Sequence, residues 1–137
     1  MPKQSINPPE LFQSLQYGFS QIVVSQTGQG ERTVYLSGQV AWDEQQQIVG
    51  QGDFQAQTHQ ALRNVQKAIQ VAGGTMADIV SMRIYFVHER HEEISCISQA
   101  LKVFFPSDQA PATTWLGVQS LANELFLIEI EAIGVLA

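Results

Sequence analysis

The stretch DFQAQTHQALRNVQKAIQVAGG, residues 53–74, decides the fold because it predicts a helix with one apolar face. Its apolar and small side chains recur at three- and four-residue spacing, the period of an amphipathic helix. They are Phe54, Thr58, Ala61, Leu62, Val65, Ala68, Ile69 and Ala72. Asp53 can cap the start of this helix, and Gly73 and Gly74 end it because glycine readily adopts the left-handed conformation of helix C-termini.

Short apolar runs on both sides of this helix predict a sheet. Before it, Phe19–Ser25 and the alternating Thr33–Val40 predict a hairpin around the glycine-containing turn at 27–32. After it come a strand, a second helix and two closing strands, expected over Ile79–Val87, Glu92–Phe105, Thr113–Val118 and Leu125–Val135.

The resulting order, β-β-α-β-α-β-β, predicts an α+β sandwich with two helices on one face of a mixed sheet of about five to six strands. Residues 1–16 contain three prolines and little periodicity, so they are expected to be an irregular lead-in to a single domain at 17–137. The uncovered face of the sheet is expected to be apolar. Such a face indicates an oligomer, because large exposed apolar patches usually mark interfaces.

Composition excludes several classes of protein. The 137 residues include seven Lys and Arg against 13 Asp and Glu, a net charge of -6, which makes nucleic acid an unlikely partner. The single cysteine excludes a disulfide framework and a thiolate-rich metal site. No membrane-spanning run or signal peptide is visible, which favours a soluble, cytoplasmic domain. Glutamine is unusually frequent, so much of the surface is expected to be neutral and polar.

Two acidic residues in the last strand are the most informative polar positions. Glu129 and Glu131 alternate with apolar residues and therefore share one face. Acids at such positions either pair with a cation, for which Arg83 is the obvious candidate, or line a wet cleft. The strand alone leaves both alternatives open. His88 and His91, three residues apart among charged residues, are better explained as a solvated turn than as metal ligands.

Five short segments occur in an order that resembles the Rid/YjgF family, the reactive intermediate deaminases. They are Ser37–Val40, Gln57–Val65, Ala72–Gly74, Phe104–Pro106 and Ile128–Ile133. The resemblance covers nearly the whole chain, from Phe19 to Gly134.

The resemblance implies a chorismate-mutase-like α+β fold, assembled as a homotrimer with small-molecule clefts between the subunits. Active members of the family hydrolyse enamines and imines to 2-keto acids and ammonia, without a metal or another cofactor. In these members an arginine holds the substrate carboxylate, a glutamate in the last strand orients water, and an aromatic residue near the N-terminus closes the cleft.

Carried over by position, the family's catalytic glutamate falls on Glu129 and the aromatic residue on Phe19. Ser37 and Gly38 take the places of the backbone and hydroxyl wall of the cleft. Ser98 takes the place of the usual asparagine of the second helix.

The arginine position departs from the family pattern, because Pro111 and Ala112 are followed by Thr113, Thr114 and Trp115. Without the arginine, a substrate carboxylate loses a charge-assisted pair worth ~1.5 to 3 kcal/mol. Trp115 either forms an aromatic wall of the cleft or packs in the core of the trimer. The resemblance thus implies a hydrolase for an imine, enamine or related C–N substrate without an α-carboxylate. The alternative is a non-catalytic protein that binds a small metabolite in the same clefts.

Overall fold

The structure is a computed structural model that describes residues 3–26, 28 and 30–137. Within these residues the chain forms six strands and two α-helices. In chain order they are β1 (Gln4–Ile6), β2 (Ile22–Gln26), β3 (Arg32–Gln39), α1 (Phe54–Val71), β4 (Ile79–Val87), α2 (Ser95–Phe104), β5 (Ala112–Val118) and β6 (Ile128–Leu136).

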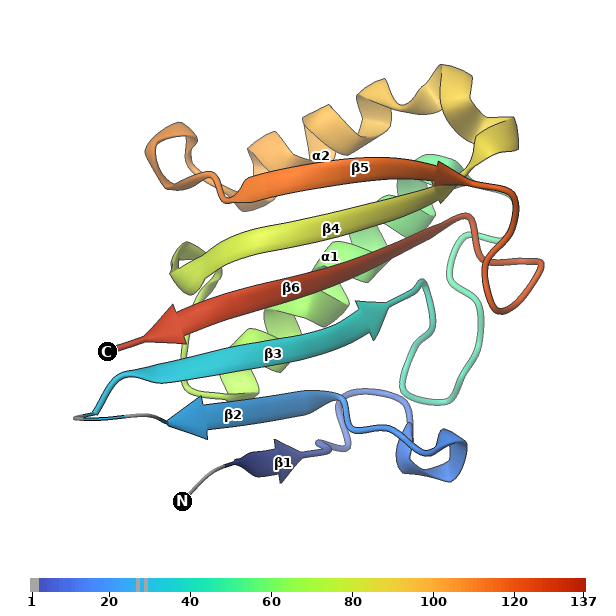
Figure 1. Cartoon of the computed structure of the whole chain (residues 1–137). Helices are drawn as coiled ribbons and strands as arrows, with labels where there is room; N and C mark the ends of the chain where they lie inside the picture. Colours follow the sequence, from blue (N-terminus) through green and yellow to red (C-terminus); the bar gives the residue numbers. More distant parts are fainter. Residues whose placement is uncertain (1–2, 27, 29) are drawn as a thin grey trace.

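The strands form one mixed sheet in the order β1-β2-β3-β6-β4-β5, and the helices cover one of its faces (Figure 1). Every neighbouring pair is antiparallel except β4 and β5, which are parallel. The predicted α+β architecture is confirmed, and so is the predicted order of elements from β2 onward. None of the helices in the described residues has the length and apolar content that a membrane crossing requires.

The lead-in is less irregular than its sequence indicates. Gln4–Ile6 pairs antiparallel with β2, and Leu11 and Phe12 are buried. The prediction of an irregular segment over 1–16 is therefore wrong for Gln4–Ile6, since three residues are too few to show a strand period, whereas residues 7–14 form no helix or strand. Residues 1 and 2 of the lead-in, and 27 and 29 of the predicted turn, lie outside the described residues.

Helix α1 begins and ends as its sequence predicts. The Asp53 side chain accepts a hydrogen bond from the Ala56 backbone N–H at 3.0 Å, and Gly73 has a φ of 99°. Between these ends, Leu62, Val65 and Ile69 are fully buried in the core, and the helix packs against β3 and β6. Burial of this face ties the helix to the two central strands that carry the candidate site.

Replacing Asp53 with Ala should lower the free energy of unfolding by about 1 kcal/mol, because the Ala56 N–H loses its capping acceptor. Urea denaturation of the two proteins measures the change. Asp43→Ala is not a matched control, because the Asp43 carboxylate also accepts backbone hydrogen bonds. Glu44→Ala, at an exposed position, should change stability by less than about 0.5 kcal/mol.

Several glutamines lie inside the molecule instead of on its surface. The buried ones are Gln21, Gln39, Gln57 and Gln60. The Gln57 side chain donates to the Leu125 carbonyl at 3.0 Å and accepts from the Leu127 N–H at 2.9 Å. The expectation that glutamine serves the surface is wrong at these positions, because buried backbone groups of loops need hydrogen-bond partners.

Asn64 on α1 has a similar role at the other side of the candidate site. Its side-chain amide donates to the Val40 carbonyl at 2.9 Å and to the Trp42 carbonyl at 2.8 Å. Gln57 and Asn64 thus fasten the segments that follow β3 and precede β6 to one rigid helix.

The open face of the sheet is mixed. It carries the polar Arg83, Tyr85, Glu129 and Glu131 together with apolar side chains, which include Leu116, Ile133 and Val135. The prediction of an apolar open face therefore holds only in part, because charged residues occupy the middle of β4 and β6.

Within β4, Val80 was expected to share the buried face of Met82, Ile84 and Phe86, but it is exposed. A register shift against β6 between Ile79 and Ser81 explains the difference. Such a bulge places an extra residue in one strand and turns its side chain to the other face.

Candidate functional site

A cavity of about 320 Å³ lies where β3 ends and β6 begins. Its lining is aromatic except for a glycine, two small or branched aliphatic residues and one carboxylate. The lining residues are Phe12, Tyr17, Phe19, Gly38, Val40, Trp42, Ala122, Phe126 and Glu129. Three of the predicted site residues, Phe19, Gly38 and Glu129, therefore meet in one cavity.

Four of the five aromatic rings of this cavity pack edge to face in a continuous row. Ring centroids lie 6.3 Å apart for Phe12 and Phe19, 5.0 Å for Phe12 and Trp42, and 4.9 Å for Trp42 and Phe126. Phe126, 4% exposed, is at the buried end, and Phe19, 39% exposed, is at the rim. Contacts of this geometry hold the rings in fixed orientations.

The Glu129 side chain lies directly over Gly38. A Cβ atom added at Gly38 would lie 2.7 Å from Cδ and 2.9 Å from Cγ of Glu129, closer than non-bonded carbon atoms approach. The register of β3 against β6 shifts between Leu36 and Gln39, next to this contact. A side chain at position 38 would therefore displace the Glu129 carboxylate, and glycine leaves the space that the carboxylate occupies.

Two effects raise the pKa of Glu129 above its usual value. Burial is the larger, and the negative charge of nearby Glu131 adds to it. In the described part of the chain, the Glu129 carboxylate has no hydrogen-bond donor and no ion-pair partner. A raised pKa makes the ionised carboxylate a stronger proton acceptor, which suits general acid–base chemistry.

Glu131, two residues further along the same face, has a different environment. It accepts a hydrogen bond from the Tyr85 hydroxyl at 2.5 Å, and Arg83 lies 3.6 Å away. Each of the two acids therefore follows a different one of the predicted alternatives, the ion pair or the cleft. Glu131 forms the ion pair with Arg83, and Glu129 lines the cavity.

The raised pKa of Glu129 predicts a pH dependence of stability. Because the folded protein binds this proton more tightly than the unfolded chain, stability decreases as pH rises from the ordinary value of 4.5 through the raised value. The Glu129→Gln variant should lack this decrease and should be more stable than wild type above this range. Thermal melts of both proteins at a series of pH values measure it; parallel curves would contradict the assignment.

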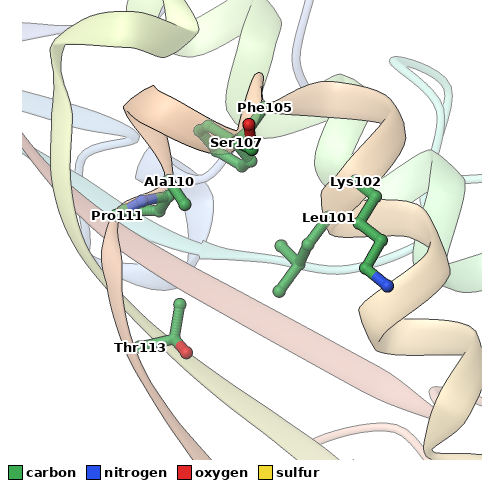
Figure 2. Close-up of a pocket in the computed structure, with 7 residues that line it drawn as sticks. All are labelled: Leu101, Lys102, Phe105, Ser107, Ala110, Pro111 and Thr113. Carbon is green, nitrogen blue, oxygen red and sulfur yellow. The ribbon is translucent and has the colours of Figure 1, made fainter.

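Thr113 lies in a second cavity of about 330 Å³, between the C-terminal part of α2 and the start of β5 (Figure 2). Most of its lining is apolar, with one cationic side chain at the edge. The residues drawn in Figure 2 are Leu101, Lys102, Phe105, Ser107, Ala110, Pro111 and Thr113.

The register of β5 explains why Thr113 and Glu129 are apart. Thr113 pairs with Met82 and Trp115 with Ile84, both of which are buried on the helix-covered side of the sheet. The Trp115 indole N–H donates to the Thr113 hydroxyl at 3.1 Å, and its ring packs against the core of its own chain. Within one chain, Thr113 and Trp115 thus lie on the opposite face of the sheet from Glu129.

The remaining predicted site residues lie outside the Glu129 cavity. Ser37 donates its hydroxyl hydrogen to the Ser20 carbonyl at 2.6 Å, and Ser98 is half-buried on α2. Thr114 is exposed and pairs with Arg83 in the sheet.

Sequence reasoning did not identify four of the aromatic lining residues, Phe12, Tyr17, Trp42 and Phe126. Trp42 gave a signal, since it lies two residues after the end of the predicted strand at Thr33–Val40. Phe12 and Tyr17 gave none, because their segment has no periodicity.

The histidines do not form a metal centre in the described part of the chain. His88 and His91 are exposed, with ring centroids 5.8 Å apart, and no group of three or more potential ligands comes together among the described residues. Cys96 is half-buried on α2.

The fold and the cavity define a small α+β protein with a partly buried carboxylate in an aromatic pocket. A model of the family described as Endoribonuclease L-PSP matches residues 15–136. The chain belongs to this family, which is also called the Rid or YjgF family.

Solved structures agree with the assignment. YyfB from Yersinia pestis, a protein of unknown function of the conserved Rid protein family, is 36% identical over 99% of this chain and 100% of its own, with a TM-score of 0.73. RidA from the Antarctic bacterium Psychrobacter sp. is 24% identical, with 97% and 99% of the chains covered and a TM-score of 0.80. Rv2704 from Mycobacterium tuberculosis is also 24% identical; the match covers 98% of this chain and 99% of Rv2704, with a TM-score of 0.75.

Proposed function

We propose that this protein hydrolyses an imine, enamine or related C–N substrate that lacks an α-carboxylate. The observation that carries the proposal is the Glu129 carboxylate, which lies over Gly38 in an aromatic cavity and has a raised pKa. The raised pKa suits a group that must act as a base in one step and as an acid in the next.

The chemistry needs one proton carrier. Glu129 takes a proton from water while the water oxygen bonds to the imine carbon, and the π electrons of the C=N bond move to nitrogen. Glu129 then returns the proton to nitrogen. The C–N bond breaks as the hydroxyl oxygen forms the carbonyl group, and the leaving amine or ammonia takes up the remaining proton. The products are one carbonyl compound and one amine or ammonia, without a redox change.

Oligomerisation belongs to the same proposal. Thr113 and Glu129 are apart within one chain, so a ligand that touches both requires a second copy. We expect a homotrimer in which the Thr113 cavity of one subunit adjoins the Glu129 cavity of another, in agreement with the resemblance. Light scattering should give three times the mass of the chain; a monomer would remove this part of the proposal.

The experiment compares two imines. One is the imine that a flavin-dependent amine oxidase releases from benzylamine, and the other is 2-iminopropanoate, which carries an α-carboxylate. Release of ammonia is followed with a coupled glutamate dehydrogenase assay and compared with the uncatalysed rate without the protein. We expect acceleration with the benzyl imine and little with 2-iminopropanoate. The reverse preference would contradict the proposed specificity.

A non-catalytic small-metabolite protein is the alternative, and it predicts binding in the Glu129 cavity with no acceleration of either imine. RNA, which the family description suggests, is opposed by the net charge of -6. Failure to shift RNA at low salt would agree with this expectation. We further propose that the reaction needs no metal or other cofactor. The protein is also proposed to be cytoplasmic.

A further inference from the structure

The charged side chain in the walls of the Glu129 cavity is acidic. Five of its nine lining residues are aromatic, and Glu129 is the only ionisable side chain apart from the Tyr17 phenol. The lining includes no Lys, Arg or His. The faces of aromatic rings carry partial negative charge and attract cations. The rings and the carboxylate therefore both favour a positively charged ligand.

Within the described residues of one subunit, the surroundings of the cavity do not supply a compensating cation; Lys102 lies at the edge of the Thr113 cavity, which the proposed trimer would bring next to this one from another subunit. Arg83, on the neighbouring strand, is 60% exposed and lies beside Glu131. Tyr85, which pairs with Glu129 in the sheet, directs its hydroxyl to Glu131 as well. The negative charge of Glu131 also reaches Glu129, since it contributes to the raised pKa there.

The geometry points to a small organic cation, an ammonium or iminium ion with an apolar body, as the ligand of this cavity. This inference rests on the cavity of the proposed function and names its substrate class: the protonated imine, not an anion. The apolar body contacts the row of rings from Phe19 to Phe126, and the charged nitrogen lies at the Glu129 carboxylate.

The reaction would benefit directly from this preference. Water adds to an iminium carbon more readily than to the neutral imine, because the positive nitrogen accepts the displaced π electrons. A cavity that favours the cation raises the bound fraction of the reactive form. It also retains Glu129 in its ionised form, which is the form that accepts a proton from water.

Binding can be tested with three unreactive probes of similar size: benzylammonium, benzyl alcohol and benzoate. Isothermal titration at pH 7.5 should show benzylammonium at least tenfold tighter than benzyl alcohol, with no measurable benzoate binding. Amide and indole NMR shifts should locate the probe at Trp42, one of the two tryptophans of the chain. Benzoate binding equal to that of benzylammonium would overturn the inference.

Matched variants separate charge from shape. Glu129→Gln should weaken benzylammonium about tenfold and leave benzyl alcohol unchanged. Glu131→Gln, on the same face but bonded to Tyr85, should leave benzyl alcohol unchanged and weaken benzylammonium much less than Glu129→Gln does. Phe19→Leu, at the exposed rim, should weaken benzylammonium and benzyl alcohol to a similar extent, because the apolar body of both probes contacts the ring. Equal losses for both probes in Glu129→Gln would overturn the cation assignment.

The two proposals can fail separately. Selective benzylammonium binding without hydrolysis of the benzyl imine would support the cation site and reject the hydrolase. Hydrolysis of that imine by a protein that binds benzoate as tightly as benzylammonium would support the hydrolase and reject the cation site.

Discussion

The Glu129→Gln variant should hydrolyse the benzyl imine about 100- to 10,000-fold more slowly than wild type at pH 7.5, the range typical of a lost acid–base group. Glutamine nearly matches glutamate in size, so the contact with Gly38 is retained while the proton carrier is lost. Single-turnover rates, measured with protein in excess of imine, report the chemical step without product release. A variant that retains most of the rate would reject Glu129 as the base.

Glu131→Gln is the control for this experiment. Glu131 is on the same strand and face, but Tyr85 and Arg83 occupy its carboxylate. Its removal should change the rate by less than about fivefold, through the small effect of its charge on the pKa of Glu129. Equal losses in the two variants would indicate a general charge effect instead of catalysis by one carboxylate.

The Gly38→Ala variant should lower kcat about 100-fold with the fold intact. The added methyl group would lie 2.7 Å from Cδ of Glu129, so the carboxylate must move away from its position in the cavity. A displacement of about 1 Å in a reacting group can cost this much. Rates are measured as for Glu129→Gln, and circular dichroism checks the fold.

Gly117→Ala is the matched control for Gly38→Ala. Gly117 is also in a strand, but a Cβ atom there would lie 3.4 Å from the nearest Phe86 ring atoms, an ordinary contact. Its rate should stay near that of wild type. A wild-type rate in Gly38→Ala would show that the position of the Glu129 carboxylate is not critical.

Periodicity predicted the elements that repeat a pattern over several turns or pairs. Helix α1 has an apolar stripe, a capping aspartate and terminal glycines, and it forms as predicted. Periodicity failed where one residue interrupts it, as at the Val80 bulge, and where a strand has only three residues, as in β1. Local patterns contain no information about such pairings, because these depend on distant neighbours.

The sequence predicted the carboxylate of the candidate site but few of the residues that form its walls. Glu129 stands out as an acid in an apolar strand, and Gly38 and Phe19 followed from the resemblance. Sequence could not place Thr113 on the opposite face, because that depends on the register of β5 against β4. The aromatic walls depend on loops that the side-chain hydrogen bonds of Gln57 and Asn64 hold in place. Such hydrogen bonds produce no repeating pattern in the sequence.

The contact between Gly38 and Glu129 also constrains how this protein can evolve. A larger residue at position 38 conflicts with the observed position of the Glu129 side chain, and aspartate at 129 would not relieve the conflict, because Cγ of Glu129 itself lies 2.9 Å from the added Cβ. As long as position 129 keeps the catalytic acid, position 38 is therefore expected to stay glycine. Directed evolution that begins from Gly38→Ala should recover activity by reversion at 38 before changes at 129.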